Sequence, residues 1–141
     1  MRLTKPTGFL SFVVQQGVFF TASYEALRDS LSTRLLPELG VRLGPRAFSE
    51  ITGERVKAFL ICGRRTPVNV AIGEFIDLNC ADDKSTGLKL ATRDCTQRFR
   101  RSPDWFRQIP GNRLAFWLPE KTVKLYEDFP VLSHSVTVKQ G

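Results

Sequence analysis

The sequence predicts an α/β fold: a buried strand and a helix, then a mixed sheet with an antiparallel edge hairpin, and a small helical extension. Three features support this prediction: a nearly continuous apolar run at residues 8–16, a helical repeat that begins at Ser23, and several strand-like segments between residues 39 and 78. The chain has 141 residues, 42% of them hydrophobic, which is enough for one modest folded unit.

The first strand and the first helix are indicated by a change of hydrophobic period. The run GFLSFVVQQ at residues 8–16 is typical of a strand covered on both faces, as in a parallel sheet between helices. After it, Ser23 can cap a helix in which leucines recur every four residues, at positions 27, 31 and 35. Because proline cannot continue a helix, we expect the helix to close at Pro37.

Three short segments after this helix predict strands, because apolar residues gather in them between turn residues. They are residues 39–43, 56–62 and 68–78. The connection between the last two, GRRTP at residues 63–67, is polar and contains glycine and proline, which favours a hairpin.

A polar segment, CADDKSTG at residues 80–87, predicts a surface loop because it has little apolar surface to bury. We place a domain boundary before it. The boundary separates a partial sheet domain at residues 1–79 from a basic arginine and aromatic extension at residues 80–141. Within the extension, Pro119 suits the first position of a last helix over residues 120–129.

Residues 93–113 carry the strongest functional signal that the residues give unaided. Six arginines are interleaved there with Phe99, Trp105 and Phe106. The segment can be an amphipathic helix that buries the rings and leaves the guanidinium groups in water. Alternatively, the guanidinium groups bind phosphate or guanine and the rings stack on unpaired bases. Both interpretations stay open, and the net charge of +7 suits polyanionic partners in general.

Cysteine and histidine usage argues against several classes of site. Cys62, Cys80 and Cys95 are odd in number and widely spaced, which predicts neither a disulfide framework nor a CxxC metal site. His134 is the single histidine, which disfavours a histidine-based triad or a multi-histidine metal centre. No apolar run approaches the roughly 18 residues that span a bilayer, and the first residues do not resemble a signal peptide. We therefore expect a cytoplasmic location.

The sequence also lacks the glycine-rich turns that bring backbone close to a phosphate, a dinucleotide or a methyl donor. No GxG, GxxxxGK or GxSxG pattern occurs. The acidic pairs, Asp82 with Asp83 and Glu50 with Glu54, are more typical of solvated loops than of a general acid and base. We therefore predict no independent catalytic centre, which favours binding or the completion of an active site that lies elsewhere.

Three segments in one order point to a known family. They are VFFTASYEALR at residues 18–28, LGPRAFSEITGERV at residues 43–56 and IPGNRLAFW at residues 109–117. The first is similar to a strand-to-helix passage of the form F-L-x-S-x-Y-x-x-L-R, the second to LG-x-x-AF-x-x-I-x-GE-x-V, and the third to IPG-x-x-x-A-Y/F-W. Together they resemble gamma-class adenine-N6-specific DNA methyltransferases, in particular those of BREX phage-defence systems and related type II restriction-modification enzymes.

The resemblance implies the carboxyl-terminal half of a Rossmann-like methyltransferase domain. Family members use S-adenosylmethionine, flip the target adenine out of the duplex and hold it at an (N/D)PP(Y/F) loop. That loop and the glycine-containing cofactor motif lie upstream in the family, and neither occurs in this sequence. The resemblance therefore implies S-adenosylmethionine for the complete enzyme and no cofactor for this chain alone. The expected partners are DNA and, in a split enzyme, a second chain that supplies the cofactor-binding half.

The resemblance also implies a role for one aromatic residue. Phe48 occupies the position of the family's aromatic side chain that stacks on the flipped base, and the alternative interpretation is a core anchor that pins the loop to the sheet. Four arginines are candidates for DNA contacts on the ground of charge alone: Arg98, Arg100, Arg101 and Arg107. No catalytic, cofactor-binding or metal-binding residue is predicted.

Three functional hypotheses follow. The first is a fragment of an adenine methyltransferase, inactive alone, that is either a truncated product or one part of a split enzyme. The second is a stand-alone basic nucleic-acid-binding module derived from such an enzyme. The third is an interaction protein that pairs with a methyltransferase through an open sheet edge.

Overall fold

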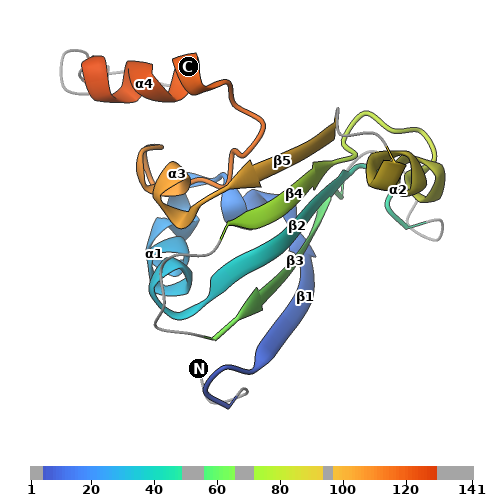
Figure 1. The fold of residues 1–141 in the computed structure, drawn as a ribbon, viewed down its shortest axis with the longest axis horizontal. Helices are drawn as coiled ribbons and strands as arrows, with labels where there is room; N and C mark the ends of the chain where they lie inside the picture. The colour runs from blue at the N-terminus through green and yellow to red at the C-terminus, as the bar shows by residue number, and fades with distance from the viewer. Residues whose placement is uncertain (1–4, 49–55, 66–71, 94–96, 130–141) are drawn as a thin grey trace.

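A computed structural model describes residues 5–48, 56–65, 72–93 and 97–129 of the chain (Figure 1). Within these residues five strands form one sheet in the order β1-β3-β2-β4-β5. The strands are β1 (Phe9–Gln15), β2 (Leu36–Gly44), β3 (Ala58–Arg64), β4 (Gly73–Asp77) and β5 (Arg98–Arg101). The helices are α1 (Glu25–Arg34), α2 (Lys84–Arg93), α3 (Pro103–Arg107) and α4 (Glu120–Asp128), with two 3-10 turns, η1 (Gln16–Phe19) and η2 (Ala22–Tyr24).

The strand pairing confirms a mixed sheet and corrects its connections. β3 is antiparallel to both β1 and β2, β2 is parallel to β4, and β4 is antiparallel to β5. The predicted hairpin at residues 63–67 is wrong, because β2 lies between β3 and β4. β2 buries residues along its length and therefore takes the central position, with β3 and β4 on its two sides. Residues 66–71 of the connection lie outside the described residues.

β1 is an edge strand of the described sheet, so the prediction that both its faces are covered is wrong. Its residues alternate between exposed and half-buried along the whole strand. Phe12 and Val14 face the core, whereas Phe9 and Val13 are 57% and 49% exposed. The apolar run hid this alternation because both faces carry large apolar side chains.

α1 begins later and ends earlier than the sequence pattern indicates. Ser23 does not cap it: the cap position is Tyr24, and no side chain donates or accepts a capping hydrogen bond there. Leu27 is 45% exposed, and the buried residue of the helix is Arg28. The helix ends at Arg34 rather than at Pro37, which lies inside β2 where the register with β3 shifts.

The segment predicted as a loop at residues 80–87 contains the start of α2, so the loop is shorter than predicted. The carboxylate of Asp83 accepts hydrogen bonds from the backbone N–H groups of Ser85 (3.1 Å) and Thr86 (3.1 Å), which satisfies two free donors at the helix start. The polar residues 82–86 (DDKST) therefore begin a helix, where their composition predicts only a loop.

The described part of residues 93–113 is not one amphipathic helix. It forms β5, which pairs with β4, followed by the short helix α3. β5 lies in the predicted extension and β4 in the predicted sheet domain, so residues of both parts share this sheet, and the division into two domains stays a prediction. The last predicted helix is confirmed as α4, but Pro119 is its cap residue rather than its first helical residue, and the helix ends at Asp128, one residue earlier than predicted.

Both faces of the sheet carry buried clusters. On one face, η1, α1, α3 and the segment at residues 114–117 pack on β3 and β4 around a mainly aromatic cluster. Its buried members are Phe19, Phe59, Ile61, Phe75, Phe106, Leu114 and Phe116. On the other face, α2 packs through Ala91 against Val41, Ile76 and Leu78. Figure 1 shows α2 at one end of the sheet and α1 with α3 at the other.

Candidate nucleic-acid interface

The carboxyl ends of the parallel strands β2 and β4 meet at one edge of the sheet, which we call the carboxyl-end edge (Gly44–Phe48 and residues 77–83). Open α/β sheets bind ligands outside such ends. Gly44 has a φ of +70°, and a Cβ atom there would lie 2.7 Å from Oδ1 of Asn79. Glycine therefore lets the two strand ends approach closely, and the chain turns from Gly44 towards Phe48.

The charged side chains of this edge are largely engaged with one another. Arg42 binds Asp77 at 3.1 Å, and Asp77 also accepts a hydrogen bond from the backbone N–H of Asn79 (2.9 Å). Arg46 pairs with Asp82 at 3.1 Å on the surface. Lys84 donates to the backbone oxygens of Leu78 (2.9 Å) and Ala81 (2.6 Å), and burial lowers the pKa of Lys84.

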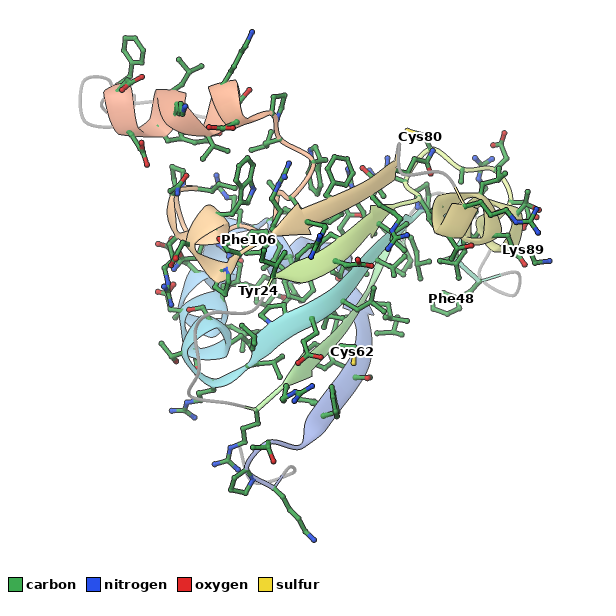
Figure 2. All side chains as sticks on the ribbon, in the orientation of Figure 1. Tyr24, Phe48, Cys62, Cys80, Lys89 and Phe106 are labelled. Carbon is green, nitrogen blue, oxygen red and sulfur yellow. The ribbon has the colours of Figure 1, made fainter. Side chains whose placement is uncertain are left out.

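Phe48 lies at the carboxyl-end edge with 44% of its surface exposed. Figure 2 shows it near α2, on the same side of the molecule as Lys89. A ring that is nearly half exposed does not act as a buried anchor, and none of the buried clusters of the described residues includes it. Its ring is available to a planar ligand group, while its role in stacking on a base stays a prediction.

Two of the four predicted DNA-binding arginines are held by carboxylates. Arg98 pairs with Glu74 across the β4–β5 ladder at 2.5 Å. Arg107 pairs with Asp104 at 2.6 Å on the surface of α3. A phosphate would have to compete with these carboxylates, which makes both residues weaker candidates than their charge alone indicates.

Arg101 is mainly a structural residue. Its guanidinium group donates to the backbone oxygens of Phe116 (3.0 Å) and Leu118 (3.4 Å) and lies 4.0 Å from the centre of the Trp105 ring. Burial lowers the pKa of Arg101. The residue therefore ties β5 to the segment at residues 116–118.

Arg100 differs from the other three predicted arginines because it is exposed and also forms no ion pair within the described residues. Its cross-strand partner is Glu74, whose carboxylate binds Arg98 instead. Among the four predicted arginines, Arg100 is therefore the one whose full charge is available to a ligand.

The structure does not bring Phe48 and Arg100 together. β5 runs antiparallel to β4, so Arg101 lies beside Gly73 at the amino end of β4, whereas Phe48 follows the carboxyl end of the neighbouring β2. The two candidate contacts therefore lie at opposite ends of the sheet.

Sequence reasoning missed Arg28, which links two of the three family-like segments. Its side chain is 2% exposed and donates to the backbone oxygens of Gly111 (2.7 Å), Thr21 (2.7 Å) and Val18 (3.1 Å). Gly111 has a φ of +71° in the turn of the IPG segment. Burial lowers the pKa of Arg28, with a further contribution from Arg113. One sequence feature could have indicated this role: Arg28 lies beside the leucines that form the predicted apolar side of the first helix.

The described residues contain neither a cluster of metal-ligating side chains nor a helix that could cross a membrane. No set of three or more cysteine, histidine and carboxylate side chains lies close enough to hold a metal ion in the described part of the chain. None of the helices described there has the length and the apolar character that crossing a membrane requires.

Comparison with curated proteins shows a distant relative of this chain. The chain is 27% identical over 130 residues to the adenine-specific methyltransferase PglX of Lacticaseibacillus casei (strain Zhang). The match covers 89% of this chain and 11% of the relative, so the chain corresponds to a small part of a much longer protein. No protein-family model matches the chain. The similarity supports a relationship between this chain and a methyltransferase.

Proposed function

We propose that the chain is part of an S-adenosylmethionine-dependent adenine-N6 DNA methyltransferase and contributes base stacking and DNA contacts rather than the methyl-transfer centre. The observation that carries this proposal is the exposed Phe48 ring at the carboxyl-end edge, within a segment that resembles the base-contacting loop of the gamma class. The similarity to an adenine-specific methyltransferase over most of the chain supports it.

In this proposal the Phe48 ring stacks on an adenine that has left the duplex. A flipped base loses the stacking of its neighbours, and an aromatic face restores roughly 1 to 3 kcal/mol of it. The loop position suits this role, because the edge outside parallel strand ends is where α/β sheets receive ligands. Arg98, Arg100, Arg101 and Arg107 stay proposed DNA contacts, with Arg100 the strongest of the four.

The cofactor is held elsewhere in this proposal. A cofactor ribose is usually bound by a free carboxylate near a glycine-rich turn. The carboxylates of Asp77 and Asp83 at this edge are instead engaged by Arg42 and by the start of α2. These residues do not fit S-adenosylmethionine, so we assign no step of methyl transfer to this chain.

A second part of the enzyme supplies the missing half in this proposal. β1 is an edge strand of the described sheet, so another strand can pair with its free side. The same partner would then bury the exposed side chains of Phe9 and Val13 on β1. This arrangement corresponds to the carboxyl-terminal half of a Rossmann-like domain, joined to the cofactor-binding half at β1.

Replacing Phe48 by alanine tests the base-stacking role. The wild-type chain is expected to bind a DNA duplex with one unpaired adenine more tightly than the fully paired duplex. Phe48→Ala should reduce that preference by roughly 5-fold to 150-fold, which corresponds to the stacking energy of one base. Fluorescence anisotropy with both labelled duplexes measures the preference directly.

Two variants control this experiment. Phe9→Ala removes another exposed phenylalanine, from β1, and should leave the preference unchanged, while Phe48→Trp should retain it. An equal preference in the wild-type chain and Phe48→Ala would count against the stacking role.

A stand-alone basic nucleic-acid-binding module is the second candidate function, favoured by the exposed Arg100 and the net charge of +7. It predicts salt-dependent DNA binding without preference for an unpaired adenine, so the same duplex pair separates the two functions. Calorimetric titration with S-adenosylmethionine adds a further test, because micromolar affinity for this chain alone would contradict the first proposal.

A further inference from the structure

A cavity of about 330 Å³ opens where β5 ends and α3 begins. Its walls are formed by Ile72, Arg100, Arg101, Ser102, Trp105 and Gln108. The volume lies near the lower end of the range of about 300 to 1,000 Å³ that ligand sites span, so the cavity suits a group no larger than a single nucleotide.

Of the two arginines in the wall of this cavity, Arg100 has no ion-pair partner among the described residues and can bind an anion. Arg100 is exposed and unpaired within the described residues, because the carboxylate of Glu74, its cross-strand partner, forms an ion pair with the guanidinium of Arg98 at 2.5 Å. The second guanidinium in the wall, that of Arg101, is fixed by backbone oxygens and by the Trp105 ring, which gives the cavity a rigid base. A free guanidinium next to a fixed wall is suited to a phosphate, which it can bind through two parallel hydrogen bonds.

The rest of the wall is chemically mixed. Ser102 and the exposed Gln108 offer neutral hydrogen-bonding groups, while Ile72, which is 57% exposed, and Trp105 offer apolar surface. An inorganic anion would leave the apolar part of this wall unused. A phosphate that carries a sugar would use the cation, the polar groups and the apolar surface together.

We propose that this cavity holds one backbone nucleotide of bound DNA, with the phosphate at Arg100 and the sugar against Ile72 and Trp105. The inference rests on the proposed function in that DNA is the partner, and it adds a second contact at the end of the sheet opposite Phe48. DNA that reaches both contacts has to extend from the carboxyl end of β2, near Phe48, to the end of β5, near Arg100.

Replacing Arg100 by alanine tests this site. Arg100→Ala should weaken binding of a paired duplex about tenfold at low salt and reduce the slope of log affinity against log salt by about 1, the contribution of one phosphate contact. The effect should be the same with and without an unpaired adenine, because a backbone contact carries no base preference. Anisotropy titrations at several NaCl concentrations give both quantities.

The control is Arg34→Ala, which removes the same charge from an exposed position of α1 outside the cavity and should leave the slope unchanged. Gln108→Ala should weaken binding without changing the slope, because it removes a neutral group of the wall. Thermal unfolding of each variant checks that the fold is retained.

The outcomes separate this inference from the proposed function. If Arg100→Ala binds like Arg34→Ala while Phe48→Ala loses its preference for the unpaired adenine, the cavity inference is wrong and the proposed function stands. If Arg100→Ala loses one unit of slope while Phe48→Ala keeps its preference, the cavity is supported and base stacking is overturned. Tighter binding of an RNA duplex than of the DNA duplex would overturn DNA as the occupant.

Discussion

Replacing Arg28 by alanine is expected to lower the free energy of unfolding by about 3 kcal/mol. The buried guanidinium donates to three backbone oxygens, at 2.7, 2.7 and 3.1 Å, and joins Gly111 to residues 18–21. Its loss leaves three partly buried carbonyl groups without this donor, and the loss of hydrogen bonds to a buried charged group costs on the order of 1.5 to 3 kcal/mol. Urea denaturation followed by circular dichroism measures the change.

Arg34→Ala is the matched control, because Arg34 lies on the same helix and is exposed. Its effect should stay within about 0.5 kcal/mol. Arg28→Lys keeps the charge but cannot fork towards oxygens on two sides, so it should fall between the two. Equal stability of Arg28→Ala and Arg34→Ala would show that the buried arginine does not hold the two segments together.

Replacing Phe116 by alanine is expected to lower the free energy of unfolding by about 4 kcal/mol. Phe116 is fully buried and stacks on Phe75 at a centroid distance of 5.1 Å, with Phe59 at 6.3 Å and Phe99 at 5.4 Å. Alanine would leave a cavity between rings that belong to three strands, and those rings cannot close it without moving the strands. Thermal and urea unfolding measure this effect.

Phe9→Ala controls for the loss of a phenylalanine, because Phe9 lies on the edge strand and is 57% exposed. Its cost should be below about 1 kcal/mol, since little apolar surface is transferred to water. Similar costs for Phe9→Ala and Phe116→Ala would contradict the position of the core on the α1 and α3 face of the sheet.

The fold class and most strand positions could be predicted from hydrophobic patterns, because strands at residues 39–43 and 56–62 carry enough apolar side chains to mark them. The order of the strands in the sheet could not be predicted in this way. The polar connection after β3 suggested a local hairpin, yet β2 separates β3 from β4. Pairing of this kind depends on which strand buries both faces, which a local pattern does not reveal.

The predictions of helix boundaries are wrong where short polar residues lie at the helix start. Asp83 starts α2 by accepting two backbone hydrogen bonds, whereas its neighbours had suggested a loop. Ser23 had suggested a cap, but α1 starts at Glu25 without one. Short polar residues favour both turns and helix starts for the same physical reason, so their sequence alone does not separate the two.

The candidate site was predictable in part. The family resemblance indicates Phe48, and the exposure of its ring is compatible with the proposed stacking. Charge alone indicates all four arginines. It does not show that Glu74 and Asp104 bind Arg98 and Arg107, or that Arg101 donates to backbone oxygens. Those pairings arise from the β4–β5 ladder and from α3, and only the folded chain distinguishes Arg100 from its neighbours.

Photochemical cross-linking tests the central claim, base stacking by Phe48, most directly. A duplex with a photoreactive azidoadenine at its single unpaired position is bound to the wild-type chain, irradiated, and the modified peptide is identified by mass spectrometry. The proposal predicts that the cross-link maps to the peptide that contains Phe48 and that it is lost in Phe48→Ala. Cross-links confined to other peptides, such as the one that contains Trp105, would contradict it.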